Sequence, residues 1–297
     1  MKLIHKTYKY LTEEVSGENL GLFRIFTSAV VIIMMLFLLP DLLNIYGSRS
    51  YFNHEIMSLL NSSFEPKIEW ITIPLQKLGI SEQLSITALV AIYLSSLFLL
   101  MLGIATRYSA LISMFLCALF TSSGEPFIYG VDYIILSCLF YCFLFPISNS
   151  FTVFHLKKKK SNKVFRFYTI IILIHLCMIY FFNGLAKSLG DTWYSGEAIW
   201  RSAMLLDTRQ FDMSFLANYP NFLKYSSLIV LFVELLFPIL VIKRITRIPA
   251  ITVTFSMHLF IGLFMGLYFF SAIMITLNIT VFYNEYRYLI YKFKYFY

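Results

Sequence analysis

Apolar residues run along this chain in long blocks that short polar stretches separate, rather than alternating with polar residues. An α-helix needs about 20 predominantly apolar residues to cross a bilayer. The blocks therefore predict an all-α fold, a polytopic membrane helix bundle of about eight transmembrane helices. The expected spans are 21–43, 84–105, 108–123, 131–147, 165–189, 225–242, 248–266 and 268–284.

The last two expected spans form one apolar stretch that only Gly262, Gly266 and an aromatic cluster at 268–270 interrupt. A hairpin of two short helices would fit this stretch. One long helix would fit it equally well, because a helix longer than the bilayer core can tilt. Both alternatives stay open at this stage.

The positions of Lys and Arg predict the orientation, since the cytoplasmic segments of membrane proteins are enriched in these residues. Eight spans with a cytoplasmic N-terminus place most of the 24 basic residues in inner segments. We therefore expect both termini to be cytoplasmic and 1–297 to form a single membrane domain. Its parts outside the spans are an amphipathic N-terminal segment 1–20, outer loops at about 44–83 and 190–224, and a basic cytoplasmic tail 285–297.

The composition supports a multi-pass membrane protein. The chain is 59% hydrophobic and 13% charged, whereas soluble domains are about 45–50% apolar and about 25% charged. The net charge of +8 is what a cytoplasmic membrane face requires, so the expected partner is the lipid bilayer and not a nucleic acid. The sequence contains no cluster of Cys and His with the spacing of a metal site, and no metal is expected.

Ionisable residues inside the apolar blocks are informative, because a charged side chain at the bilayer centre costs about 2.5–3.5 kcal/mol on insertion scales. Residues retained at this cost usually face the protein interior. Six residues of this chain meet the criterion: Arg24, Asp132, His175, Lys187, Glu234 and His258. Arg24, only a few residues into the first span, could instead extend to the inner headgroups as a topology anchor.

Counting along straight helices at about 1.5 Å per residue places Glu234, His175 and His258 in one layer near the middle of the membrane. Asp132 and Lys187 fall in the next layer, towards the outer side. A carboxylate beside imidazoles in a low dielectric could relay protons. The alternative is a hydrogen-bonded network that only fixes the packing of the helices.

Lys187 admits two interpretations. A lysine shielded from water can lose its proton and act as a general base. It can also extend to the outer phosphates, or pair with Asp132 or Asp191. Nearby, Trp193 fits an interfacial aromatic residue, and Asn183 would allow close helix contact.

Five patches of the sequence are characteristic when taken in order. They are 20–24 at the start of the first span, 129–132 at the start of the fourth, Asn183 through Lys187 and Trp193 to Gly196, Glu234 with Pro238, and His258 with Gly262 and the apolar run 269–274. In order and spacing these patches resemble the HTTM domain, the membrane domain shared with vitamin K-dependent gamma-carboxylase. The resemblance covers roughly 16–284.

Within that superfamily, a chain of 297 residues without the large C-terminal extramembrane region of the carboxylases is most similar to the sporulation-delaying protein B family. The resemblance implies an integral membrane factor of the bacterial plasma membrane that is required for maturation of a secreted antimicrobial peptide toxin precursor, a bacteriocin. It also implies action at the outer side of the membrane together with a small co-encoded maturation partner. Whether the protein is an enzyme is left open.

The candidate catalytic residues are Lys187, Asp132, Glu234, His258 and His175, and the candidate substrate-binding residues are Arg24, Trp193 and Asn183. Two other functions are kept as alternatives. One is a lipid-quinone-dependent enzyme of the gamma-carboxylase type, with a quinone as possible cofactor. In the carboxylases two adjacent lysines occupy this stretch, where the present chain has Lys187 followed by Ser188. The other alternative is a peptide exporter.

Overall fold

The computed structural model describes residues 17–48, 50–51, 65–124, 127–153, 163–205 and 210–294. Every regular element in these ranges is a helix, which confirms the all-α fold. The described residues of Ser16–Ser161 form one compact unit, called the N-terminal unit, and those of Asn162–Tyr297 form a second, called the C-terminal unit. The single domain expected over 1–297 stays a prediction.

Several of the expected surface segments fall partly outside the described residues. The N-terminal segment 1–20 is described only from 17, and the loop at 44–83 lacks 49 and 52–64. The loop at 190–224 lacks 206–209, and the basic tail 285–297 is described as far as 294.

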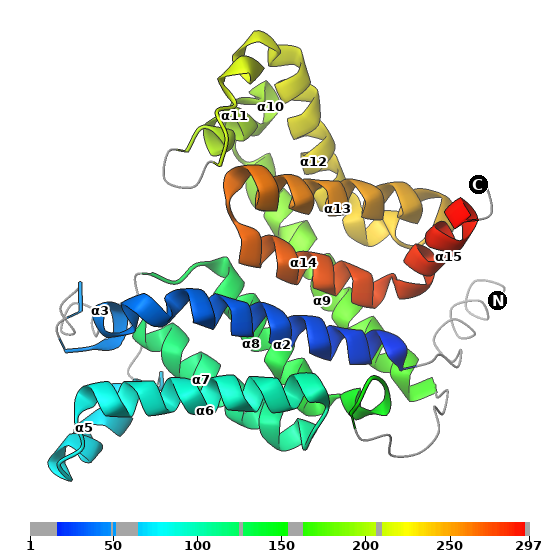
Figure 1. Ribbon diagram of the computed structural model, residues 1–297. Coiled ribbons are helices and arrows are strands. Elements are labelled where there is room, and N and C mark those ends of the chain that lie inside the picture. Colours follow the sequence, from blue (N-terminus) through cyan, green and yellow to red (C-terminus); the bar gives the residue numbers. More distant parts are fainter. Residues whose placement is uncertain are drawn as a thin grey trace. The chain divides into compact units, whose positions relative to one another are not determined.

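In its described part, the N-terminal unit is built on four long helices: α2 (Glu18–Leu38), α6 (Glu82–Leu102), α7 (Thr106–Ser123) and α8 (Gly130–Leu144). Helix α2 packs against α6 and α8, and α7 packs against the same two helices, so that the four close on one another (Figure 1). The shorter elements are η1 (Leu39–Asp41), α3 (Leu42–Tyr46), α5 (Glu69–Lys77) and η2 (Ile147–Asn149).

Local signals in the sequence set the ends of α6. Ser81 caps its N-terminus, where the hydroxyl oxygen accepts a hydrogen bond from the amide of Leu84 at 3.3 Å. Gly103 ends the helix in the left-handed conformation (φ 80°), which glycine adopts at little cost. Between these ends, Tyr93 stacks on Phe120 of α7 with 5.8 Å between ring centroids, and this contact fixes the pairing of the two helices.

The C-terminal unit contains five longer helices: α9 (Lys163–Ser188), α12 (Pro220–Leu240), α13 (Arg244–Met265), α14 (Tyr268–Val281) and α15 (Tyr283–Lys294). Helix α9 packs against α12 and α14, and α12 packs against α13 (Figure 1). Three short elements lie between α9 and α12 in the chain and are called the cap: α10 (Asp191–Ser195), α11 (Glu197–Ala203) and η3 (Ser214–Asn218).

The stretch that admitted either one long helix or a hairpin is a hairpin. Helix α13 stops at Met265, and Gly266 turns the chain in the left-handed conformation (φ 70°). Helix α14 then runs back along α13 (Figure 1). Gly262 lets the two helices approach closely, since a Cβ at this position would lie 2.9 Å from the hydroxyl oxygen of Ser271.

The cap packs on the first turns of α12 and on the α13–α14 turn. Its buried cluster is Ala203, Met213, Leu216 and Leu223, against which Ile199, Trp200, Met204, Phe260 and Phe264 pack. The amide of Gln210 also donates a hydrogen bond to the carbonyl of Phe264 at 3.1 Å. This end of the C-terminal unit is called the cap end.

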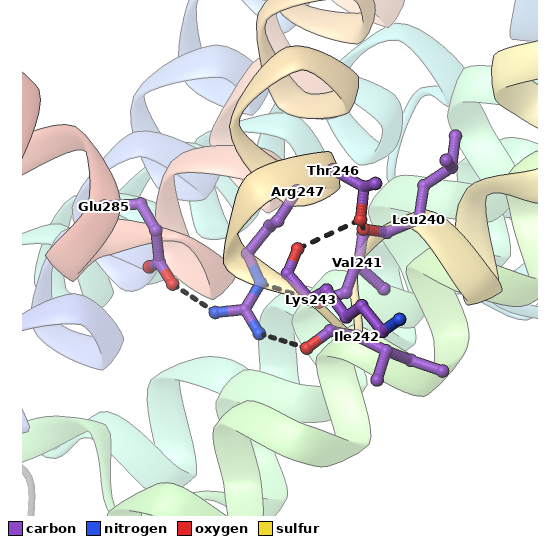
Figure 2. Close-up of polar contacts among 7 residues, drawn as sticks. All are labelled: Leu240, Val241, Ile242, Lys243, Thr246, Arg247 and Glu285. Carbon is purple, nitrogen blue, oxygen red and sulfur yellow. Dashed lines mark hydrogen bonds and ion pairs between the residues drawn. The ribbon is translucent and has the colours of Figure 1, made fainter.

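The opposite end of the C-terminal unit, called the basic end, is fastened by Arg247 (Figure 2). Its guanidinium donates to the carbonyls of Val241 at 2.6 Å and Ile242 at 3.1 Å, directly after the last turn of α12. It also pairs with Glu285 of α15 at 2.5 Å. A cation is favourable at a helix C-terminus, where carbonyl groups lack intrahelical partners. One side chain therefore holds α12, α13 and α15 together.

Five helices of the described residues are long and apolar enough to cross a membrane: Glu18–Tyr46, Glu82–Leu102, Val164–Ser188, Pro220–Leu240 and Arg244–Met265. Helices α8 and α14 are apolar but shorter. The protein is therefore a membrane-embedded helical protein. Each of the eight expected spans contains a helix, although the crossing of the membrane by all eight stays a prediction. Helix α12 begins at Pro220, five residues before the expected start at 225, because proline suits the first helical position, where its missing N–H is not needed.

Candidate functional site

Lys187 and Glu234 form an ion pair inside the C-terminal unit. The ammonium nitrogen of Lys187, in the last turn of α9, lies 2.5 Å from Oε2 of Glu234 in the middle of α12. The Glu234 side chain is 4% exposed, whereas that of Lys187 is 23% exposed. The carboxylate is therefore held inside the unit, and the lysine is the partner that another molecule can reach.

The ion pair depends on a close approach of α9 and α12. Gly184 lies one turn before Lys187, and a Cβ at this position would stand 2.5 Å from the backbone nitrogen of Leu235, next to Glu234. Real Cβ atoms do not approach a backbone so closely, so a larger residue would push the helices apart. The absence of a side chain at Gly184 is what lets Lys187 reach Glu234 across the interface.

Trp193 covers the lysine from the cap side. Its ring lies 4.8 Å from the ammonium nitrogen of Lys187, within the range of a cation–π contact. The Trp193 backbone is fixed in turn, because its carbonyl accepts a hydrogen bond from the hydroxyl of Ser227 on α12 at 2.6 Å. Lys187, Glu234 and Trp193 are together called the lysine site.

The ammonium group of Lys187 has more N–H donors than its partners in the lysine site use. An ammonium group has three N–H donors, and in the lysine site one is directed to Glu234 while the ring of Trp193 stabilises the charge. A further donor is therefore available for a carbonyl, carboxylate or phosphate oxygen of an incoming molecule.

A second polar cluster joins α9, α13 and α14. The hydroxyl of Tyr180 lies 2.9 Å from Nε2 of His258, and the amide nitrogen of Asn278 donates to the same hydroxyl oxygen at 2.8 Å. All three residues are almost completely buried. The hydroxyl of Thr254 lies 3.4 Å from the amide oxygen of Asn278 and extends the cluster by one residue.

The hydrogen bonds of Asn278 fix the orientation of its amide. The amide nitrogen also donates to the carbonyl of Met274 at 2.8 Å, and a carbonyl can only accept. Tyr180 therefore accepts from Asn278. Its hydroxyl and Nε2 of His258 are partners whose donor depends on the tautomer of the imidazole. Nδ1 of His258 is buried and has no hydrogen-bond partner among the described residues.

The lysine site and the Tyr180 cluster share two helix faces. Tyr180, Gly184 and Lys187 follow one another at spacings of four and three residues, which places them on one face of α9. On α12, Phe237 packs against the Tyr180 ring with 4.4 Å between centroids, and Glu234 lies three residues before it. We expected Glu234 to share a layer with two histidines. The structure instead pairs it with Lys187, and the partner of His258 is Tyr180.

Arg24 is buried in the N-terminal unit and bonds to the backbone. Its guanidinium donates to the carbonyls of Leu100 at 2.8 Å, Ser150 at 3.2 Å and Phe151 at 2.6 Å, and the residue is 0% exposed. Leu100 is in the last turn of α6, the negative end of the helix dipole. Phe151 adopts the left-handed conformation (φ 56°), where two consecutive carbonyls meet the same cation. Arg24 thus joins three segments and does not extend to the headgroups.

The remaining candidates lie elsewhere. Asp132, in the N-terminal unit, accepts from the amide of Tyr129 at 3.0 Å and stabilises the first turn of α8. Burial and the nearby Asp132 charge raise the pKa of the Tyr129 phenol to about 12. On α9, His175 is half-buried and lies about 140° around the helix from Tyr180. Asn183 is exposed, and its amide donates to the carbonyl of Ile179 in its own helix at 2.7 Å.

Four participating residues were not among the sequence candidates: Tyr180, Asn278, Thr254 and Ser227. All four are uncharged at neutral pH, whereas the candidates at membrane depth are Arg, Lys, His, Asp and Glu side chains. Asn278 is nonetheless an amide in the middle of an apolar run, where a polar group needs a partner. The four-and-three spacing from Tyr180 to Lys187 is also visible in the sequence. Extending the depth rule to Asn and Tyr would have found both residues.

Among the described residues, no group of three or more His, Cys, Asp and Glu side chains is placed to share a metal ion. Comparison of the chain with known protein families, with curated proteins and with solved structures gives no match.

Proposed function

We propose that this chain is an integral membrane factor that matures a secreted antimicrobial peptide toxin precursor, as a member of the sporulation-delaying protein B family within the HTTM superfamily. In this proposal the chain crosses the bacterial plasma membrane eight times, with both termini in the cytoplasm. The cap end of the C-terminal unit then faces the outer side, where an exported precursor and a small co-encoded partner would meet it. The resemblance of the five sequence patches supports this assignment.

The observation that carries the proposal is the lysine site. In this site a lysine is paired with a buried glutamate, is covered by a tryptophan and is still 23% exposed. An ion pair of this kind is costly to hold inside a membrane protein, and ionisable residues retained at this cost are usually functional. Two of the five resembling patches, 183–196 and Glu234 with Pro238, meet at this site. The lysine site is thus where sequence resemblance and local chemistry coincide.

In the catalytic form of the proposal, Lys187 contacts the precursor and Glu234 acts behind it. Transfer of a proton from the ammonium of Lys187 to the carboxylate of Glu234 gives a neutral amine and a neutral acid, a state that a low dielectric favours. The amine can then take a proton from the substrate, or from a water molecule that attacks the substrate. Trp193 shields the pair and limits its contact with bulk water.

The test compares the intact masses of secreted peptides from strains that carry variants of this chain. Lys187→Met should abolish the short mature peptide and leave the precursor uncut or differently cut. Lys224→Met, an exposed lysine at the cap end, is the matched control and should leave maturation unchanged. The amount of each variant in the membrane is measured in parallel.

The double variant Lys187→Met/Glu234→Leu removes both charges and separates loss of chemistry from loss of folding. It should accumulate normally and remain inactive. Normal maturation with either Lys187 variant would exclude the lysine site from the function. A mature peptide that differs from the precursor by a carboxyl group would instead favour the quinone-dependent carboxylase.

A further inference from the structure

An exposed aromatic surface lies at the cap end of the C-terminal unit. Five aromatic residues within fifteen positions of the chain are each more than half exposed: Phe211, Phe215, Tyr219, Phe222 and Tyr225. They extend from the segment before η3 into the second turn of α12. Large contiguous apolar patches of this kind on a protein surface mark contacts with another protein or with a membrane.

Buried side chains on the opposite side of the segment hold the backbone that carries these rings. Met213, Leu216 and Leu223 alternate with the exposed rings and are buried in the cluster of the cap. The amide of Gln210 is hydrogen-bonded to the carbonyl of Phe264, and the amide of Ser214 donates to the carboxylate of Asp212 at 2.9 Å. The exposed rings cannot turn inward without displacing this cluster, so they stay on the outer side of the segment, beside the exposed polar side chains of Asp212 and Lys224.

The aromatic surface continues directly into the exposed face of α12. Below Tyr225 the helix exposes Ile229 and Phe232. A groove of about 480 Å³ follows the same face and is lined by Tyr225, Leu228, Ile229, Leu231, Phe232 and Leu235. Helix α12 is long and apolar enough to cross a membrane, so side chains exposed along it face lipid. The aromatic surface extends that face beyond the start of the helix.

We propose that the aromatic surface is in contact with the lipid of the leaflet at the cap end, so that its five rings enter the bilayer while the exposed polar side chains of 210–225 stay at the level of the headgroups. Its composition fits this environment. Tyrosine rings are enriched where one end meets apolar chains and the hydroxyl meets the headgroups, and Tyr219 and Tyr225 frame Phe222 in this way. The surface carries three phenylalanines, which have no polar group for a wet interface.

Contact with lipid has a consequence for the lysine site, and this consequence rests on the proposed function. Trp193, which covers Lys187, is hydrogen-bonded to Ser227, two residues after Tyr225 on α12. The tryptophan that covers the lysine site is therefore held beside the aromatic surface, and Glu234 lies further along the same helix. A substrate that arrives at this end moves along a lipid surface, which favours a membrane-bound apolar segment of the precursor over a freely soluble peptide.

Site-directed spin labels test the lipid contact. The full chain, with its four cysteines replaced by serine, carries Phe215→Cys or Phe222→Cys and is reconstituted in liposomes of phosphatidylethanolamine and phosphatidylglycerol. Collision of each label with oxygen, which concentrates in lipid, is compared with collision with a water-soluble nickel chelate. The control is Arg201→Cys on α11, whose native side chain is 68% exposed.

We expect oxygen to exceed the nickel chelate several-fold at 215 and 222, with the reverse order at 201. Nickel collision at 215 and 222 equal to that at 201 would place the aromatic surface in water and overturn the proposal. Weak collision with both reagents at 215 and 222 would mean that protein covers it, which also overturns the proposal.

A second measurement avoids the cysteine-free background. The unmodified chain in the same liposomes is treated with a diazirine that partitions into the membrane, and the labelled peptides are identified by mass. Labels should fall on the peptide that contains Phe211, Phe215 and Tyr219 and not on α11. An unlabelled 210–225 peptide would contradict the lipid contact. The maturation assay does not depend on this result, so the two proposals can fail independently.

Discussion

Arg24 in the N-terminal unit and Lys187 in the C-terminal unit are both cations inside apolar helices, and their surroundings differ in kind. Arg24 is 0% exposed and donates to three backbone carbonyls, one at the end of α6 and two in the turn at 150–151. Lys187 has a single carboxylate partner, an aromatic ring over its charge, and 23% of its side chain exposed.

The difference separates a structural cation from one that is free to act. The partners of Arg24 are carbonyls with no charge of their own, and nothing outside the protein can reach the guanidinium. A fork of fixed N–H groups suits this role, since its two terminal nitrogens reach three acceptors at once. The lysine has a proton acceptor beside it and a path to an incoming molecule. The buried Arg24 therefore stabilises the fold of the N-terminal unit, whereas in the proposed function Lys187 supplies a reactive group in the C-terminal unit.

The largest effect is expected from Arg24→Met. Three carbonyls would lose a charged donor, and hydrogen bonds to charged groups are each worth roughly 1.5–3 kcal/mol. We expect poor accumulation in the membrane and a strongly lowered melting temperature in detergent. Arg24→Lys should not restore stability, because one ammonium cannot reproduce the guanidinium fork. Arg107→Met, at an exposed position of α7, is the control. If Arg24→Met were as stable as the native chain but no longer supported maturation, Arg24 would not be a structural cation and would instead be a substrate-binding residue.

A smaller loss of stability is expected from Lys187→Met, together with recovery in a double variant. Removing the cation leaves Glu234 buried without a partner, which costs about 3–5 kcal/mol. Lys187→Met/Glu234→Leu replaces the pair by apolar side chains and should return to within about 1 kcal/mol of the native stability. Chemical denaturation in mixed micelles measures the three free energies of unfolding. If Lys187→Met were as stable as the native chain, the burial of the Glu234 carboxylate would not depend on the charge of Lys187.

Gly184→Ala tests the contact that brings the pair together. The added Cβ would meet the backbone of Leu235 at 2.5 Å, so α9 and α12 must separate, at a cost of about 1–3 kcal/mol. Maturation should fall further than stability, because Lys187 and Glu234 move apart. Gly190→Ala is the matched control, since its nearest neighbour, in the Trp193 ring, lies at 3.6 Å. Equal melting temperatures for the two variants would show that the helices are not in close contact.

The smallest effect is expected from Tyr180→Phe, which removes one hydroxyl from the buried cluster. Nε2 of His258 loses its hydrogen-bond partner, while Asn278 keeps its bond to Met274, so the loss should be about 1–2 kcal/mol. Tyr219→Phe, at an exposed position, should change stability by less. If Tyr180→Phe abolished maturation without changing stability, the Tyr180 cluster would belong to the reaction and not to the packing of the helices.

The helices could be located from the sequence, and the contacts between them could not. Long apolar blocks fix where helices lie because each must be about as long as the bilayer is thick. Depth along a straight helix then placed Glu234 inside its span but did not identify Lys187 as its partner, since depth does not give the face of the helix. The periodicity of α9 separates His175 from Tyr180 and Lys187, and this signal was available.

The role of Arg24 could not have been predicted in the same way. Its partners are backbone carbonyls at 100, 150 and 151, and a carbonyl acceptor leaves no signature in the side chains. The left-handed Phe151 is equally invisible, because phenylalanine seldom adopts that conformation and the sequence around it is ordinary. Contacts of this kind become apparent only once the segments have been folded together.

The partners of Arg24 also impose an order in time on biosynthesis. Ser150 and Phe151 follow it by 126 and 127 residues, which a ribosome adds in about 6–25 s at ~5–20 residues per second. The guanidinium lacks all three acceptors until Leu100, 76 residues later, has been added. It lacks two of them until 150 and 151 follow. During those seconds the helix depends on the insertion machinery, or on water near the membrane surface, to accommodate the charge, and it can settle at full depth only when the 150–151 turn arrives.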